Sequence, residues 1–86
     1  MHIRAIVARN LRKMRVLKGL SQENLAVDAG IDRTYVSRLE RGLENPTVEV
    51  LDRIAKALDR DIIGFFDDVS PDEPEVRPLK GGRKPK

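Results

Sequence analysis

Glycine residues divide this chain into short apolar segments, and this division limits the folds that it can adopt. Three glycines are each followed within five residues by a residue that caps helix N-termini: Gly19 by Ser21, Gly30 by Asp32, and Gly42 by Thr47. Glycine accepts the left-handed backbone that ends a helix, and Ser, Asp or Thr accepts hydrogen bonds from the free N–H groups that start the next one. Within the segments, apolar residues recur every three to four positions, which is helical spacing. The sequence therefore predicts an all-α fold between residues 3 and 66.

Five short helices are expected, with these limits: up to Gly19, residues 22–29, residues 33–41, from Thr47 onward, and from Asp61 to Phe66. Asn45 is an alternative cap for the fourth helix, with Pro46 as its first residue. The apolar stripes of the first four helices predict a core made of Ile3, Ile6 or Val7, Asn10 or Leu11, Met14 and Leu17; Leu25, Ala26 and Ala29; Val36 and Leu39; and Val48, Leu51, Ile54, Ala55 and Leu58.

The character of the chain changes after Phe66. Residues 67–86 contain few apolar side chains, and their charges are first acidic and then basic. A segment with so little to bury does not offset the entropy lost when the chain becomes ordered. We therefore predict one folded domain over residues 1–66 and a flexible acidic-then-basic tail over residues 67–86.

The residue inventory excludes several classes of site. The chain has no cysteine, and its single histidine is His2, so a disulfide and a Cys/His zinc site are both excluded. A nucleophile–base pair and a glycine-rich phosphate loop are also missing, so we expect no enzyme and no cofactor. No secretory segment, membrane-spanning run or effector pocket is evident, which indicates a cytoplasmic protein without a small-molecule effector.

The basic residues are concentrated near the start of the chain, although the net charge is only +3. Residues 1–20 carry six basic side chains and no acidic one. A locally basic surface on a nearly balanced chain suits a nucleic-acid partner.

The spacing of four residues is typical of two helices that meet at a tight turn. Counted from Gln22 as the first position, Ala26 is fifth, Gly30 ninth, Val36 fifteenth and Leu39 eighteenth. The small residue lets the two helices approach, glycine takes the positive φ of a short turn, and the last two residues fix the later helix to the core. A plain helical hairpin is the alternative, but the pattern favours a helix-turn-helix.

The outward face of the third helix suits a groove lined by phosphates. With Val36 as the inward reference and about 100° per residue, the residues outside or at the edge are Arg33, Thr34, Tyr35, Ser37, Arg38 and Arg41. These are basic and hydroxyl-bearing side chains without an acid. Arginine can pair bidentately with guanine, and Thr or Tyr can meet a thymine methyl or a phosphate. A solvated basic face is the alternative.

Glu40 is the exception on this helix, because the same geometry places it on the core side. An unpaired carboxylate is costly there. Arg15 of the first helix is the partner that we expect, and a bridge between them would lock the first helix to the third.

Four motifs carry a resemblance to a known family: Leu11-Arg12-x-x-Arg15, Gly19-Leu20-Ser21-Gln22-Glu23-x-Leu25-Ala26, Val36-Ser37-x-Leu39-Glu40-x-Gly42 and Pro46-Thr47. They closely resemble the phage repressor and Cro-type regulators, the XRE family, over roughly residues 4–66. The run Asp32-Arg33-Thr34-Tyr35-Val36-Ser37, with Glu40-Arg41-Gly42 and Asn45, is most similar to controller proteins of restriction–modification systems. The chain departs from the family after Leu58, where Asp59 and Arg60 replace a glycine and an apolar residue.

The resemblance implies a transcriptional regulator that binds double-stranded DNA with sequence specificity and places its recognition helix, 33–41, in the major groove. It implies that Gln22 contacts a phosphate and braces the recognition helix, and that Asn45 holds the DNA backbone. Arg15 and Glu40 would form the structural ion pair of the family. The residues that would face base edges are Arg33, Thr34, Ser37 and Arg38.

The expected fifth helix carries more apolar side chains than one face can bury. Ile62 and Phe65 would pack into the core, and Ile63 and Phe66 would remain exposed as an association surface. The alternative is that all of them wrap the end of the core. The family resemblance favours a homodimer on a two-fold symmetric operator. The alternative function is an antitoxin-like or other protein-interaction module that uses the same fold.

Overall fold

The computed structural model describes residues 2–67, which form an all-helical structure without strands. The elements are α1 (Ile3–Lys18), α2 (Gln22–Ala29), α3 (Arg33–Glu40), α4 (Val48–Ala57) and the 3₁₀ helix η1 (Ile62–Phe66). The predicted fifth helix is therefore a 3₁₀ helix, and the third ends at Glu40, with Arg41 as its C-cap. Of the predicted tail, residues 67–86, all but Asp67 lies outside the described residues.

Side-chain caps begin four of these elements where the sequence predicts them. Ser21 Oγ accepts from Asn24 N–H at 3.0 Å, Asp32 Oδ2 from Thr34 N–H at 2.9 Å, Thr47 Oγ1 from Val50 N–H at 3.1 Å, and Asp61 Oδ1 from Ile63 N–H at 3.0 Å. Each bond satisfies an N–H group that has no partner inside its helix. Of the two caps considered for α4, Thr47 is the one observed.

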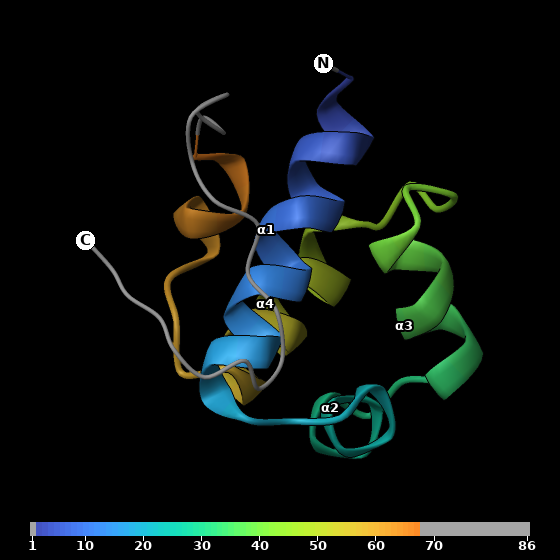
Figure 1. Ribbon diagram of the computed structural model, residues 1–86, viewed down its shortest axis with the longest axis vertical. Coiled ribbons are helices and arrows are strands. Elements are labelled where there is room, and N and C mark those ends of the chain that lie inside the picture. Colours follow the sequence, from blue (N-terminus) through green and yellow to red (C-terminus); the bar gives the residue numbers. More distant parts are fainter. Residues whose placement is uncertain (1, 68–86) are drawn as a thin grey trace.

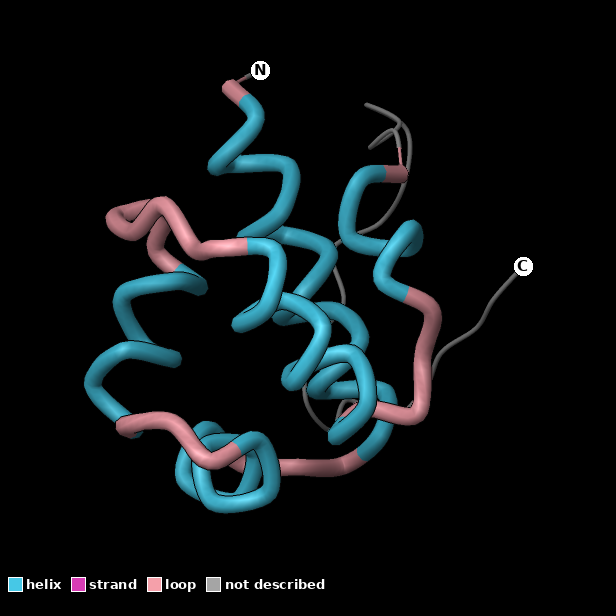
Figure 2. The backbone as a smooth tube through the Cα atoms, turned by 180° about the vertical axis from the view of Figure 1, so that it is seen from behind, coloured by secondary structure: helices cyan, strands magenta, loops and turns pink. Residues whose placement is uncertain are grey.

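Helix α1 runs through the middle of the molecule (Figure 1). α2 packs against both α3 and α4, while α1 packs against α3 and η1. Seen from the front and from behind, α3 and η1 lie on opposite flanks of α1 (Figures 1 and 2). This separation gives the molecule two distinct outer regions.

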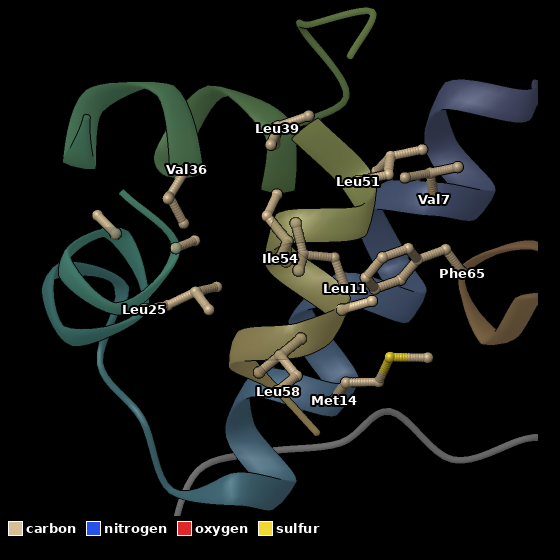
Figure 3. Close-up of a cluster of buried hydrophobic side chains, with 13 residues drawn as sticks. Val7, Leu11, Met14, Leu25, Val36, Leu39, Leu51, Ile54, Leu58 and Phe65 are labelled. Carbon is tan, nitrogen blue, oxygen red and sulfur yellow. The ribbon is translucent and has the colours of Figure 1, made fainter. Parts of the chain in front are cut away.

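Apolar side chains from all five elements converge on one core (Figure 3). The largest fully buried side chains are Phe65, Leu11, Leu25, Ile54, Leu58 and Val36. The predicted interior positions of α2 and α3 are confirmed, as are those of α4 from Leu51 onward. Burial of this apolar surface is the main force that holds such short helices together, because isolated helices of this length are marginal in water.

Three predicted core positions are wrong: Ile3, Leu17 and Val48 are 58%, 59% and 73% exposed. Ile3 and Leu17 lie near the two ends of α1. Ile3 lies in the exposed first turn of α1 and Leu17 in its exposed last turn, and Val48 occupies the exposed first turn of α4.

Candidate nucleic-acid interface

The turn between α2 and α3 fixes the direction in which α3 leaves the core. Gly30 has φ +71°, and the N–H of Ile31 donates to the carbonyl of Ala26 at 2.9 Å. Ala26 is buried beside this turn, and Val36 and Leu39 anchor α3 in the core. A residue with a Cβ would be strained at position 30, because this backbone conformation is costly for L side chains.

An ion-pair network then locks α3 to α1. Arg15 Nε and Nη2 donate to the two carboxylate oxygens of Glu40 at 2.6 and 3.0 Å, and Arg15 Nη1 donates to the carbonyl of Leu20 at 2.8 Å. The two side chains are only 13% and 4% exposed. A fork of this kind fixes orientation as well as distance, so it sets how α3 is presented to a ligand.

Gln22 joins the same network from the start of α2. Its Nε2 donates to Glu40 Oε1 at 3.1 Å, which links α2 to α3. An amide nitrogen carries two N–H groups, so this bond leaves one donor for a phosphate. The arrangement is compatible with both roles that the family resemblance implies for Gln22.

The outward side of α3 is polar. Here we call it the α3 face, made of Arg33, Thr34, Tyr35, Ser37 and Arg38. Arg33, Thr34 and Arg38 are exposed, while Tyr35 and Ser37 are half-buried. Helix α3 forms one flank of the molecule (Figures 1 and 2), and Arg33, Thr34 and Arg38 are the solvent-exposed members of this face.

The C-terminal end of α3 brings an acidic residue to this face, which sequence reasoning missed. Gly42 (φ +73°) donates to Leu39 and Leu43 donates to Arg38 through their backbone N–H groups, the paired bonds of a Schellman turn. The chain therefore folds back beside α3, and Glu44 Oε2 accepts from Arg38 Nε at 2.7 Å. The glycine at position 42 was the available signal, because this type of cap reverses the chain.

Glu44 also lies close enough to Tyr35 to affect its ionisation. Burial raises the pKa of the Tyr35 hydroxyl above its ordinary value of 10.0, and the negative charge of Glu44 raises it further. Tyr35 packs against the core with part of its ring. Its hydroxyl is therefore neutral at physiological pH and can donate as well as accept.

The remaining predicted residues lie in separate places. Asn45 is exposed in the loop before α4. Ile63 and Phe66, which we call the η1 face, are 68% and 46% exposed on the flank opposite α3. Phe65 is fully buried, and Ile62 packs partly against the core.

η1 is attached to α1 by a buried amide. Asn10 Nδ2 donates to the carbonyls of Phe65 and Asp67 at 2.9 and 3.0 Å. Among the described residues, Asn10 is a polar residue buried in the core. The two bonds satisfy the N–H groups of its amide. The contact holds the η1 face in place against α1.

Within residues 2–67 no cluster of His, Cys, Asp or Glu side chains could hold a metal ion. None of the helices in that range is long and apolar enough to cross a membrane.

Comparison with known proteins identifies relatives of this chain. The helix-turn-helix family matches residues 11–65. The control protein C.SmaI of Serratia marcescens is 42% identical over 62 residues, which are 72% of this chain and 74% of that protein. A hypothetical transcription factor of Neisseria meningitidis is 48% identical over 56 residues, 65% of this chain but only 53% of its own length.

Solved structures agree with this relationship. The restriction-modification controller protein C.AhdI of Aeromonas hydrophila is 40% identical, with a TM-score of 0.72 over 73% of this chain and 96% of that one. The controller protein C.Esp1396I, solved as a tetramer in complex with its natural 35 base-pair operator, is 36% identical, with a TM-score of 0.70 over 77% of this chain and 87% of that one. By family match and by relatives, this chain is a member of the XRE-type helix-turn-helix regulators.

Proposed function

We propose that this protein is a sequence-specific transcriptional regulator that binds double-stranded DNA and has no catalytic activity. α2 and α3 form the helix-turn-helix, and α3 enters the major groove. The observation that carries the proposal is the α3 face: an outward helix side with basic and hydroxyl groups, oriented by the network of Arg15, Gln22 and Glu40. A rigidly held polar helix can present donors to base edges with little loss of freedom on binding.

The roles proposed for single residues follow from their positions. Arg33, Thr34, Ser37 and Arg38 read base edges, and Tyr35 meets a thymine methyl or a phosphate. Gln22 and Asn45 lie at the two ends of the motif, before and after the reading helix, where contacts to the DNA backbone fix the docking register.

The proposed assembly is a homodimer on a two-fold symmetric operator, associated through the η1 face. Two exposed apolar side chains three residues apart in the 3₁₀ helix, Ile63 and Phe66, support this surface. A dimer would place its two α3 helices about 34 Å apart, one turn of the DNA helix. The operator complex of C.Esp1396I is a precedent for DNA binding by an assembly of such chains. As a DNA regulator, the protein would act in the cytoplasm.

Selection of bound duplexes from a random pool tests this function. We expect enrichment of a palindromic sequence with half-sites one helical turn apart, and sedimentation of a dimer both free and bound. Recovery of unenriched sequences would leave only non-specific binding, and a monomer at high micromolar concentration with DNA present would exclude the dimer.

A further inference from the structure

The contact between Arg38 and Glu44 is the part of the α3 face that its proposed function does not yet explain. A carboxylate beside a DNA-binding surface repels phosphates, so its presence weakens binding unless it contributes something else. Glu44 is 28% exposed and Arg38 45% exposed, so both side chains are near the surface.

The two acceptors around Arg38 engage the same edge of its guanidinium group. Glu44 Oε2 lies 2.7 Å from Nε, and the carbonyl of Leu43 lies 3.5 Å from Nη2. A guanidinium has a second edge, formed by Nη1 and Nη2, which can donate two hydrogen bonds to O6 and N7 of guanine. The residues after α3 therefore hold Arg38 by one edge and leave the other edge in a position to read a base.

Restraint of the Arg38 side chain lowers the entropic cost of a contact with a base. A free arginine loses rotamer freedom when it docks on a guanine, and a contact that already limits the side chain reduces this loss. A phosphate contact gains little from such restraint, because it depends mainly on net positive charge. The same carboxylate therefore has opposite consequences for the two kinds of contact.

We propose that Glu44 is a specificity-determining residue that positions Arg38 for a base contact and lowers affinity for DNA of any sequence. The proposal rests on the DNA-reading function proposed for α3. It assigns to the loop after α3 a role in discrimination between DNA sequences.

Two substitutions separate positioning from charge. Glu44→Gln removes the charge, and Glu44→Asp keeps the charge but withdraws the carboxylate by one methylene. Glu49→Gln is the matched control, because Glu49 is an exposed acid in the first turn of α4. The probes are a duplex recovered by selection from a random pool and a random duplex of equal length, compared at one salt concentration with the full chain.

We expect Glu44→Gln to raise affinity for the random duplex about threefold, since one repulsive charge near phosphates is lost. The ratio of selected-duplex to random-duplex affinity should fall about fivefold or more, the lower end of what a bidentate base contact contributes. Glu44→Asp should lower the same ratio without raising random-duplex affinity. Glu49→Gln should change both affinities by the same factor.

An equal rise of the affinities for the selected and the random duplex in Glu44→Gln would overturn the proposal, because Glu44 would then act only through electrostatic repulsion of phosphates. A larger rise on the selected duplex would also overturn it, since Glu44 would be a competitor for Arg38. In an Arg38→Ala background, Glu44→Gln should leave the ratio unchanged, and a further fall there would refute action through Arg38. If the parent protein enriches no sequence, the proposed DNA-reading function fails, and the proposal for Glu44 fails with it. If the parent enriches a sequence and one of the negative outcomes above is found, only the proposal for Glu44 fails.

Discussion

The α3 face and the η1 face lie on opposite flanks of α1 and are held in place by different interactions. α3 is oriented by a nearly buried ion pair and an amide, in which Arg15 and Gln22 both donate to Glu40. η1 is anchored by the fully buried ring of Phe65 and by the Asn10 amide. Both regions therefore depend on α1, but one presents charges and hydroxyls and the other presents apolar side chains.

The difference matches the two proposed partners, which are DNA at the α3 face and a second copy of the chain at the η1 face. A charged fork fixes direction, which a helix that reads bases requires. Apolar burial is less directional, and an uncovered apolar pair suits association with a second apolar surface. Variants that disturb one region and leave the other intact test this division.

The largest effect is expected from Glu40→Gln. It leaves the Arg15 guanidinium, only 13% exposed, without its charged partner, and loss of a partner in a buried pair costs about 3–5 kcal/mol of unfolding free energy. Chemical denaturation measures this loss. The control is Asp52→Asn, which breaks the exposed pair with Lys56 and should cost about 0.3–0.5 kcal/mol. A denaturation curve like that of the parent would show that the network does not stabilise α3.

Phe66→Glu addresses the η1 face. Burial of an aromatic side chain in an interface contributes about 1.5–3 kcal/mol, so the dimer dissociation constant should rise tenfold or more. Sedimentation measures it, and circular dichroism should show unchanged helicity. Val27→Glu is the matched control, because Val27 is an apolar residue of α2 that is 73% exposed. Dimerisation that survives Phe66→Glu would place the association surface elsewhere.

Asn10→Ala tests whether the η1 face depends on its anchor. Two carbonyls, of Phe65 and Asp67, lose their donor, so unfolding free energy should fall by about 1–3 kcal/mol and dimerisation should weaken in parallel. Asn10→Asp, which cannot donate when ionised, should be worse than Asn10→Ala. If the Asn10 variants lower stability without weakening dimerisation, the η1 face does not depend on the Asn10 anchor.

Two further substitutions separate base reading from contact with the DNA backbone. Arg38→Ala should cost about 1–3 kcal/mol on the selected operator and relax the preference at one base pair per half-site. Asn45→Ala should weaken binding to all sequences by similar factors, because a backbone contact carries no base information. Both variants are titrated against operator, single-base variants and random duplex at one salt concentration. If Arg38→Ala weakens operator and random duplex equally, Arg33 and Thr34 become the better candidates for base reading.

The helix boundaries could be predicted because their causes are local. Ser21, Asp32, Thr47 and Asp61 cap the N-H groups two or three residues ahead, and such bonds need no distant partner. The pairing of Arg15 with Glu40, 25 residues apart, was also accessible, because a carboxylate on the core side of a helix requires a partner.

Other features depend on where elements end relative to one another. The periodicity of α1 places Ile3 and Leu17 on the apolar stripe, but the packing of the other elements leaves both side chains exposed. The short η1 segment was expected as an ordinary helix and is a 3₁₀ helix, a form common in short connections.

The sequence by itself determined the all-helical class, the starts of the helices and the inward residues of α2 and α3, because each of these follows from contacts or periodicity within a few residues. Only the tertiary structure decided that Gln22 joins the Arg15–Glu40 network, that Glu44 folds back onto Arg38, and that Asn10 anchors η1. These contacts join residues that a turn or a packed helix brings together, and their geometry depends on the whole arrangement of the core. A polar side chain signals that it needs a partner, but the packing of the helices decides which partner it finds.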